Sequence, residues 1–336
     1  MISIAKDAQT NCDVISLKND NIELVVTDYG ATILKVIVKD KNGQSCDVVL
    51  GFESLDDYRA KGGTYLNAIV GRVANRIGKG TFVLNGQRYH VPVNNGPNSL
   101  HGGIDGFSYK LWDYETSDKQ VTFHYHAQDG EEGYPGNLDV DVTYQLLDDG
   151  YKIIYHATGD QDTIVNMTNH AYFNLNGHPS SIYNHEMTVH ASHIGCVDED
   201  GLFTGTILDV TDTPFDFRQS KAIGDMITKP HIQLELGNGY DHSFLFDRTN
   251  QQIELYSPES GVVMTVSTTL PLAQIYTGNY LNNEKSKDGS LLKPRDGICF
   301  ETQYLPDSIN KETDSPVILR AGDSYDEETS FTFKVK

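Results

Sequence analysis

The sequence is poor in cysteine and in positive charge. Its 336 residues include four cysteines, and none of them forms a C-x-x-C pair, so no zinc or redox motif is visible. Lysine and arginine number 26 against 47 aspartates and glutamates, which gives a net charge of −21. A nucleic-acid-binding protein needs a basic face, and an anionic membrane repels an acidic chain. We therefore expect neither partner, whereas a neutral small molecule fits this charge.

Long apolar runs and secretion signals are missing as well. No run approaches the roughly 20 residues of a membrane span, and residues 1–10 lack the basic and apolar regions of a signal peptide. The motifs G-x-G-x-x-G and G-x-x-x-x-G-K-[ST] are absent, which argues against a nucleotide-binding parallel sheet. Without a secretion signal, the cysteines are expected to stay reduced. The sequence thus predicts a cytoplasmic protein.

Alternation of apolar and polar side chains dominates what is present. It is clearest in residues 138–146, and it recurs in residues 121–127, 187–192 and 331–336. Further strand-like runs cover residues 22–27, 33–38, 47–50, 152–156, 164–168, 253–257 and 262–268. Runs of period two between Gly, Asn and Asp clusters are typical of antiparallel sheets with one buried face.

Helix signals are few. Ser54 is a candidate N-cap for a short helix over residues 55–60, and no long amphipathic helix follows elsewhere. We find no repeat, low-complexity tract or linker, so the prediction is a single domain over residues 1–336. Its expected fold class is all-β: a large, twisted antiparallel β-sandwich with few short helices.

Five short stretches concentrate Gly, Asn, His and acidic residues: 71–77, 100–103, 169–175, 239–244 and 297–303. Among their residues, an Arg, two His, an Asp and a Glu form a set suited to binding hydroxyls and moving protons. Glu301 is flanked by Cys299 and Phe300 in a strand-like run. Burial there would raise its pKa and make it a better base near neutral pH. A Glu on a solvated strand face is the plainer alternative.

The remaining candidates each allow a structural reading too. His170 could transfer a proton near neutral pH, or it could simply bond a loop carbonyl. His101 precedes two glycines, which allow close approach of a ligand, but it could equally sit exposed in a turn. Asp241 could accept two sugar hydroxyls or belong to a turn that begins at Asn238 and Gly239.

Two arginines compete for one role. Arg76, which follows Asn75, offers several fixed donors for ring hydroxyls, and Arg72 lies four residues earlier. Either could instead form an ion pair in this acidic protein. His124 and His126 have a spacing that can chelate a metal, but no third ligand is specified. A solvated strand face, shared with the nearby aspartates 139 and 141, explains them better.

In order and spacing, the five stretches resemble those of the aldose 1-epimerases, or galactose mutarotases, from about residue 21 onward. The resemblance implies a galactose mutarotase-like supersandwich. It also implies a catalytic base at Glu301, a catalytic acid at His170 and substrate-binding residues at Asn75, Arg76, His101, Asp241 and Tyr276. The first twenty residues and residues 304–322 match the family only loosely.

The function implied by the resemblance is interconversion of the α and β anomers of galactose and glucose by ring opening and reclosure. It requires neither a cofactor nor a metal, and it leaves open whether the protein is a monomer or a homodimer. Three alternatives are a sugar-phosphate 1-epimerase, which would need more Arg or Lys at the pocket mouth, a glycosidase that pairs Asp241 with Glu301, and a sugar-binding sandwich without catalysis.

Overall fold

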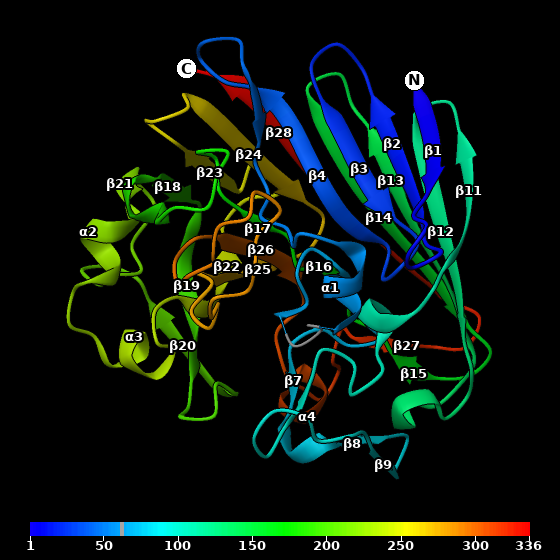
Figure 1. Cartoon of the computed structure of the whole chain (residues 1–336). Helices are drawn as coiled ribbons and strands as arrows, with labels where there is room; N and C mark the ends of the chain where they lie inside the picture. Colours follow the sequence, from blue (N-terminus) through cyan, green and yellow to red (C-terminus); the bar gives the residue numbers. More distant parts are fainter. Residues whose placement is uncertain (61–63) are drawn as a thin grey trace.

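The computed structural model describes residues 1–60 and 64–336, and in this part of the chain alternating segments pair into antiparallel sheets (Figure 1). The nine-stranded sheet has the order β11 (Asp113–Ser117), β12 (Gln120–Ala127), β13 (Leu138–Leu146), β14 (Gly150–Gly159), β28 (Ser324–Val335), β24 (Val262–Thr268), β23 (Ile253–Tyr256), β18 (Glu186–Val189), β21 (Lys221–Ala222). The five-stranded sheet runs β1 (Ile2–Lys6), β2 (Asp13–Lys18), β3 (Glu23–Thr27), β4 (Thr32–Lys39), β5 (Ser45–Asp47). These sheets confirm the all-β prediction.

A six-stranded sheet carries much of the pocket described below. Its order is β17 (Tyr172–Phe173), β26 (Ile298–Gln303), β25 (Leu272–Tyr276), β22 (Asp241–Phe246), β19 (Ala191–Val197), β20 (Phe203–Asp209). Short pairs complete the sheets: β10 (Ser99–Leu100) with β7 (Arg76–Ile77), β15 (Thr163–Ile164) with β27 (Ile318–Leu319), β16 (Thr168–Asn169) with β6 (Ile69–Val70), and β8 (Thr81–Leu84) with β9 (Gln87–His90).

The large sheets stack into a sandwich around one apolar core. The five-stranded sheet lies over the β11–β14 end of the nine-stranded sheet (Figure 1), and the hydroxyl of Tyr144 crosses to the carbonyl oxygen of Ala31 at 2.7 Å. The six-stranded sheet packs near β28, where the ring of Phe173 lies 5.2 Å from that of Phe331. Because side chains alternate along a strand, one face of β26 enters this core and the other is free to line a pocket.

Most predicted strands are present, but three differ. Residues 187–192 were expected to form one strand; the structure ends β18 at Val189 and begins β19 at Ala191. The two strands belong to different sheets, and alternation cannot reveal a crossing from one sheet to another. Of residues 164–168, only the first lies in β15 and only the last in β16, and β5 ends at Asp47 instead of continuing to residue 50.

Helices are short throughout the described residues: α1 (Leu55–Ala60), α2 (Ile223–Ile227), α3 (Ile232–Leu236) and α4 (Ser308–Lys311). The predicted cap of α1 is confirmed, because the backbone N–H of Asp57 donates to Ser54 Oγ at 3.3 Å. None of these helices is long and apolar enough to cross a membrane.

The outer face of the nine-stranded sheet pairs histidines with aspartates. His124 Nδ1 lies 2.6 Å from a carboxylate oxygen of Asp141, and His126 has the same distance to Asp139. Both pairs sit directly opposite each other on β12 and β13, with side chains more than a third exposed. The prediction of a solvated strand face at these residues is confirmed.

Candidate active site

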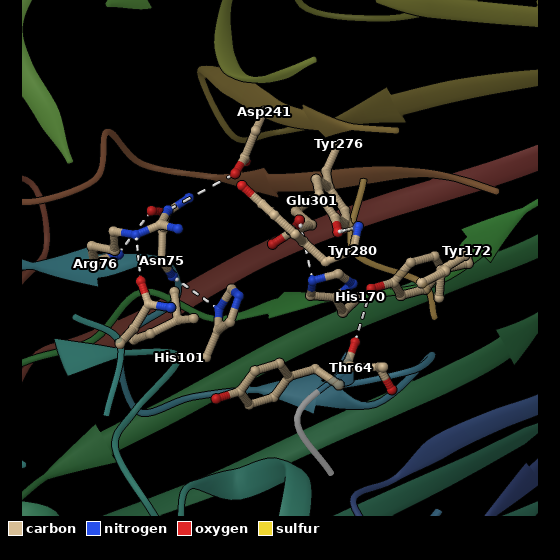
Figure 2. Close-up of a pocket in the computed structure, with 14 residues that line it drawn as sticks. Thr64, Asn75, Arg76, His101, His170, Tyr172, Asp241, Tyr276, Tyr280 and Glu301 are labelled. Atoms are coloured by element: carbon tan, nitrogen blue, oxygen red, sulfur yellow. Dashed lines mark hydrogen bonds and ion pairs between the residues drawn. The ribbon is translucent and has the colours of Figure 1, made fainter. Parts of the chain in front are cut away.

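The predicted site residues converge on one pocket of about 230 Å³ (Figure 2). All seven line it: Asn75, Arg76, His101, His170, Asp241, Tyr276 and Glu301. They come from segments that are far apart in the sequence, so the fold rather than local sequence brings them together.

The six-stranded sheet supplies the acidic wall through its register. Asp241 on β22 lies opposite Tyr276 on β25, and Gln274 on β25 lies opposite Glu301 on β26. Since directly opposed residues and residues two apart share a face, these four side chains point to the same side of the sheet. Gln274 Nε2 donates to Asp241 Oδ1 at 2.7 Å, which fixes the orientation of that carboxylate.

On the opposite wall, two hydrogen bonds join the segments that carry Asn75 and His101. The backbone N–H of Asn75 donates to His101 Nδ1 at 3.1 Å, and the backbone N–H of His101 donates to the carbonyl oxygen of Asn75 at 3.0 Å. Gly102 makes this approach feasible, because a Cβ there would lie 2.0 Å from the carbonyl oxygen of Gly71. With Nδ1 accepting, the neutral ring of His101 carries its proton on Nε2.

The two candidate arginines separate clearly. Arg76 donates through Nε to Asn95 Oδ1 at 3.0 Å, and its Nη1 lies 4.0 Å from Asp241 Oδ2. Arg72 points elsewhere: it is buried, and its Nη1 donates to the carbonyl oxygen of Pro135 at 2.8 Å. Of the two, Arg76 is therefore the one whose donors reach the pocket.

His170 and Glu301 form a buried pair, with Nε2 and Oε1 3.5 Å apart. Burial lowers the pKa of His170 to about 4. Burial, and then the nearby Asp241 carboxylate, raise the pKa of Glu301 well above its ordinary value. Glu301 Oε2 has no hydrogen-bond partner among the described residues. One carboxylate oxygen is thus left available to a ligand in a dry environment.

Aromatic rings hold His170 in place. Its ring stacks on Tyr172 at 5.0 Å between centroids and on Tyr65 at 6.2 Å, and it meets Tyr276 edge-on at 6.0 Å. The Nδ1 atom lies 3.4 Å from the sulfur of Cys299. The imidazole therefore has a fixed plane, with Nε2 toward Glu301 and Nδ1 toward the thiol.

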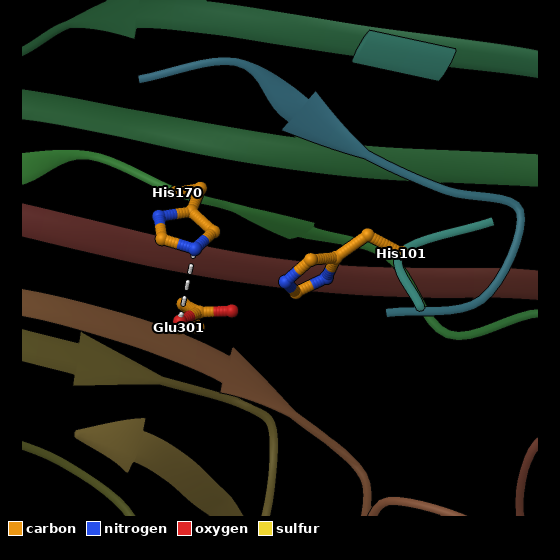
Figure 3. Close-up of side chains that lie close together, drawn as sticks. All are labelled: His101, His170 and Glu301. Atoms are coloured by element: carbon orange, nitrogen blue, oxygen red, sulfur yellow. Dashed lines mark ion pairs between the residues drawn. The ribbon is translucent and has the colours of Figure 1, made fainter. Parts of the chain in front are cut away.

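The donor atoms of His101, His170 and Glu301 lie within 4.8 Å of one another, which invites comparison with a metal site (Figure 3). Two histidines and a carboxylate are a common ligand set. However, metal binding through His101 Nε2 would require that nitrogen to lose its proton, and Nδ1 could then not accept from Asn75. The hydrogen-bond pattern favours a hydroxyl-bearing ligand over a cation.

Sequence reasoning missed half of the lining: Thr64, Tyr65, Asn95, Leu100, Tyr172, Tyr280 and Leu281. Leu100 and Tyr172 lie inside two of the five stretches and could have been found there. Tyr65 and Asn95 come from turns without a chemical signature, so only the tertiary fold reveals them.

Comparisons with known proteins agree with this geometry. A sequence model of the aldose 1-epimerase family matches residues 13–332. The galactose mutarotase of Sus scrofa is 43% identical over 325 residues, which cover 95% of this chain and 93% of that protein. The aldose 1-epimerase of Escherichia coli K12 is 35% identical over 330 residues, which cover 95% of this chain and 94% of that protein.

Solved structures show the same architecture. The GalM/aldose epimerase homologue from C. elegans superposes with a TM-score of 0.90 and 31% identity, covering 96% of this chain and 99% of that one. Galactose 1-epimerase from Lactobacillus acidophilus NCFM superposes with a TM-score of 0.88 and 29% sequence identity. The match covers 100% of this chain and 99% of that one. Fold and matches together define an enzyme that acts on carbohydrates. The chain belongs to the aldose 1-epimerase family.

Proposed function

We propose that this protein interconverts the α and β anomers of galactose and glucose, with Glu301 as base and His170 as acid. The observation that carries the proposal is the buried Glu301–His170 pair, 3.5 Å apart, at the wall of a pocket whose lining also includes groups suited to binding hydroxyls. Membership of the family and the names of the relatives support the same reaction.

The reaction opens and recloses a hemiacetal. Glu301 removes the proton from O1, and His170 donates a proton to the ring oxygen O5 as the C1–O5 bond breaks. The resulting aldehyde rotates about the C1–C2 bond. Attack of O5 on the other face of C1 reverses both transfers, so each group ends with the proton count it began with. General acid–base catalysis of this kind contributes about 10²–10⁴-fold.

The proton count of the pair is consistent with these roles. Burial favours the neutral forms of both groups. The proposed reactive form, a carboxylate beside an imidazolium, contains the same number of protons. The two groups therefore titrate as one unit, and the reactive form requires no net proton uptake.

The other pocket residues would hold the sugar while C1 rotates. Asp241, fixed by Gln274, can accept hydroxyl protons; Arg76 and the Nε2–H of His101 can donate to hydroxyl oxygens. Asn75 and Tyr276 complete the lining on opposite walls. Charge-assisted bonds of this type are about twice as strong as neutral ones.

The alternatives are less well supported. Phosphate recognition needs several cations. The described lining contains one residue of this kind, Arg76, and it already lies beside the carboxylate of Asp241. A glycosidase would use Asp241 and Glu301 across a glycosidic bond. A sugar-binding protein without catalysis would need no buried acid–base pair.

Polarimetry of freshly dissolved α-galactose tests the proposal. We expect the protein to accelerate the approach to the equilibrium rotation, and we expect Glu301→Gln to abolish the acceleration. Saturable galactose binding without acceleration would instead favour a binding protein. Acceleration for a sugar phosphate alone, or release of an aryl leaving group from a glycoside, would favour the other enzymes.

A single domain and a cytoplasmic location are further parts of the proposal. The site draws on segments from Asn75 to Glu301, which supports one cooperative unit. All four cysteines are free, as expected in a reducing compartment. One calorimetric unfolding transition would support the first point, and cell fractionation tests the second. The choice between monomer and homodimer stays open to sedimentation analysis.

A further inference from the structure

The side-chain amide of Asn95 offers the pocket a donor that no described residue uses. Its oxygen, Oδ1, accepts a hydrogen bond from Arg76 Nε at 3.0 Å. Because a guanidinium only donates hydrogen bonds, this contact fixes which end of the amide faces the arginine. The Nδ2 group therefore points away from Arg76, and it has no hydrogen-bond partner among the described residues. Since Asn95 lines the pocket, this group is available to a ligand.

Asn95 and Arg76 are both held in place by the protein itself. The backbone groups of Asn95 and Asn98 exchange two hydrogen bonds, at 3.0 and 2.9 Å, and close a tight turn. On the other side of the guanidinium, Arg76 Nη1 lies 4.0 Å from Asp241 Oδ2. A Cβ at Gly201 would lie 2.9 Å from Arg76 Cζ, so the guanidinium packs directly against that glycine. The donor of Asn95 therefore has a preset direction.

The contacts along one wall of the pocket lead from His170 to Asn95. The ring centroids of His170 and His101 are 5.3 Å apart. His101 is hydrogen-bonded in turn to the backbone of Asn75, and Arg76 is the next residue in the chain. Asn95 follows through its bond to Arg76. On this wall, His170 and Asn95 are thus the two ends of one series of contacts.

The acidic wall leads to the same corner. Asp241 on β22 is separated from Glu301 on β26 by one strand, β25. Beyond Asp241 comes Arg76, joined to it by the ion pair drawn in Figure 2. Both walls therefore meet at Arg76 and its neighbour Asn95, away from the buried proton-transfer pair.

The proposed function indicates which part of the sugar this corner meets. In that reaction, O1 and the ring oxygen O5 face Glu301 and His170. Across a six-membered ring, C4 lies opposite C1 and C3 lies opposite O5. The corner formed by Arg76 and Asn95 therefore faces the C3–C4 edge of the sugar. C4 is the carbon at which galactose and glucose differ.

We propose that Asn95 is a substrate-binding residue whose Nδ2 group donates to a hydroxyl oxygen on the C3–C4 edge. The identity of that edge rests on the proposed function, whereas the contact with the sugar can be tested by binding alone. If the acceptor is O4, the same contact distinguishes galactose from glucose.

Fluorinated sugars test the direction of this hydrogen bond. Fluorine accepts weakly and has no proton to donate, so it tolerates the N–H of Asn95. Asn95→Asp keeps an oxygen for Arg76 but replaces the donor by an acceptor. A hydroxyl can turn its proton toward the new carboxylate, and a fluorine cannot. We therefore expect Asn95→Asp to weaken binding of 3-deoxy-3-fluorogalactose or 4-deoxy-4-fluorogalactose about tenfold more than binding of galactose, as for an unpaired acceptor.

Fluorine-19 NMR titration measures these affinities directly, with galactose as the competitor. The control sugar is 2-deoxy-2-fluorogalactose, whose binding should be affected no more than that of galactose. The control variant is Asn250→Asp, which makes the same chemical change at an exposed amide outside the pocket lining. It should alter none of the affinities.

Equal effects of Asn95→Asp on galactose and on both the 3-fluoro and the 4-fluoro sugar would overturn the inference. An extra loss with the 2-fluoro sugar alone would overturn the assigned edge. If Asn95→Asp does not fold, Asn95→Ala replaces it. Removing the contacted hydroxyl, in 3-deoxygalactose or 4-deoxygalactose, should then cost wild type about three- to tenfold in affinity and the variant less than about twofold. Equal costs in both proteins would contradict the contact.

These titrations need no turnover, so their result is separable from the outcome of polarimetry. Accelerated mutarotation without the extra fluorine penalty would leave the proposed function standing and remove Asn95 from the binding site. The extra penalty without acceleration would keep the contact and remove the reaction.

Discussion

Among the His–carboxylate pairs of the described residues, those on the outer face of the nine-stranded sheet and the one in the pocket differ in almost everything except composition. On the outer face of the nine-stranded sheet, Asp113, His124, Asp141, His156 and Asp326 occupy successive strands in one register row. In this row the bonds from His124 to Asp141 and from His156 to Asp326 are both 2.6 Å long. The pocket pair, His170 and Glu301, is looser at 3.5 Å.

We expect the outer-face pairs, although closer, to be less reactive than the pocket pair, because water surrounds them. The side chains of His124 and Asp141 are 39% and 44% exposed, against 6% and 3% for His170 and Glu301. Water screens charge and supplies hydrogen bonds to both protonation states, so an exposed pair contributes little. The comparison shows what distinguishes a candidate proton-transfer pair. It is desolvation and a carboxylate oxygen without a hydrogen-bond partner, Glu301 Oε2, rather than a short distance between the two groups.

The largest expected effect comes from removing the buried carboxylate. Glu301→Gln should lower the mutarotation rate by about 10²–10⁴-fold, because the amide cannot accept the O1 proton. Asp141→Asn is the matched control, since it makes the same chemical change in an exposed pair. Polarimetry should find that control within about twofold of wild type. Equal losses in both variants would contradict the distinction drawn here.

His170→Asn should reduce the rate by a similar factor of about 10²–10⁴. On the proposed mechanism the two groups act as one unit, so combining His170→Asn with Glu301→Gln should cost little more than either change alone. His124→Asn serves as the control. Losses that multiply in the double variant would show that the two residues act independently.

Asp241→Asn tests the part of the pocket assigned to binding. Loss of hydrogen bonds to a charged group costs about 1.5–3 kcal/mol, so we expect KM for galactose to rise about tenfold or more. The value of kcat should change less than KM. A fall in kcat at unchanged KM would instead give Asp241 a role in the chemical step.

Burial should also make Glu301 costly for stability. Its folded-state pKa is raised above the ordinary 4.5, so the folded state resists ionisation that the unfolded chain undergoes freely. The contribution of the neutral Glu301 carboxyl to wild-type stability is therefore lost as pH rises above about 4.5. Glu301→Gln should be more stable than wild type at pH 7, by about 0.5–2 kcal/mol, and the gain should shrink toward pH 4. Thermal unfolding across this range measures it; a gain independent of pH would contradict the titration argument.

The smallest effect is expected on the outer face. Asp141→Asn breaks the 2.6 Å contact to His124, yet exposed ion pairs typically contribute only about 0.2–1 kcal/mol. Urea unfolding at pH 6 and pH 8 would measure the loss. A cost well above this range would mean that the row of paired charges is cooperative.

The strands of the sheets could be predicted from the sequence because apolar and polar side chains alternate along them. Strand β13 (Leu138–Leu146) has the bounds expected from alternation. The crossing between sheets after Val189 was not predictable, because both strands keep the same period. In the pocket, the residues predicted from the five stretches do line the cavity, whereas Tyr65 was not predicted, since it adopts a positive φ of 50° in a turn without a motif. Local pattern predicts strands; the close approach of remote turns depends on packing.

The position of β28 has a consequence for how the protein is made. This strand lies between β14 and β24, and its Glu328 contacts Lys152 across 176 positions of sequence. During synthesis, β14 and β24 leave the ribosome with their inner edges unpaired until residues 324–335 emerge. Exposed edges of this kind invite pairing with other chains. The nascent protein therefore has a prolonged interval in which aggregation competes with folding, and chaperone binding should be strongest just before β28 appears.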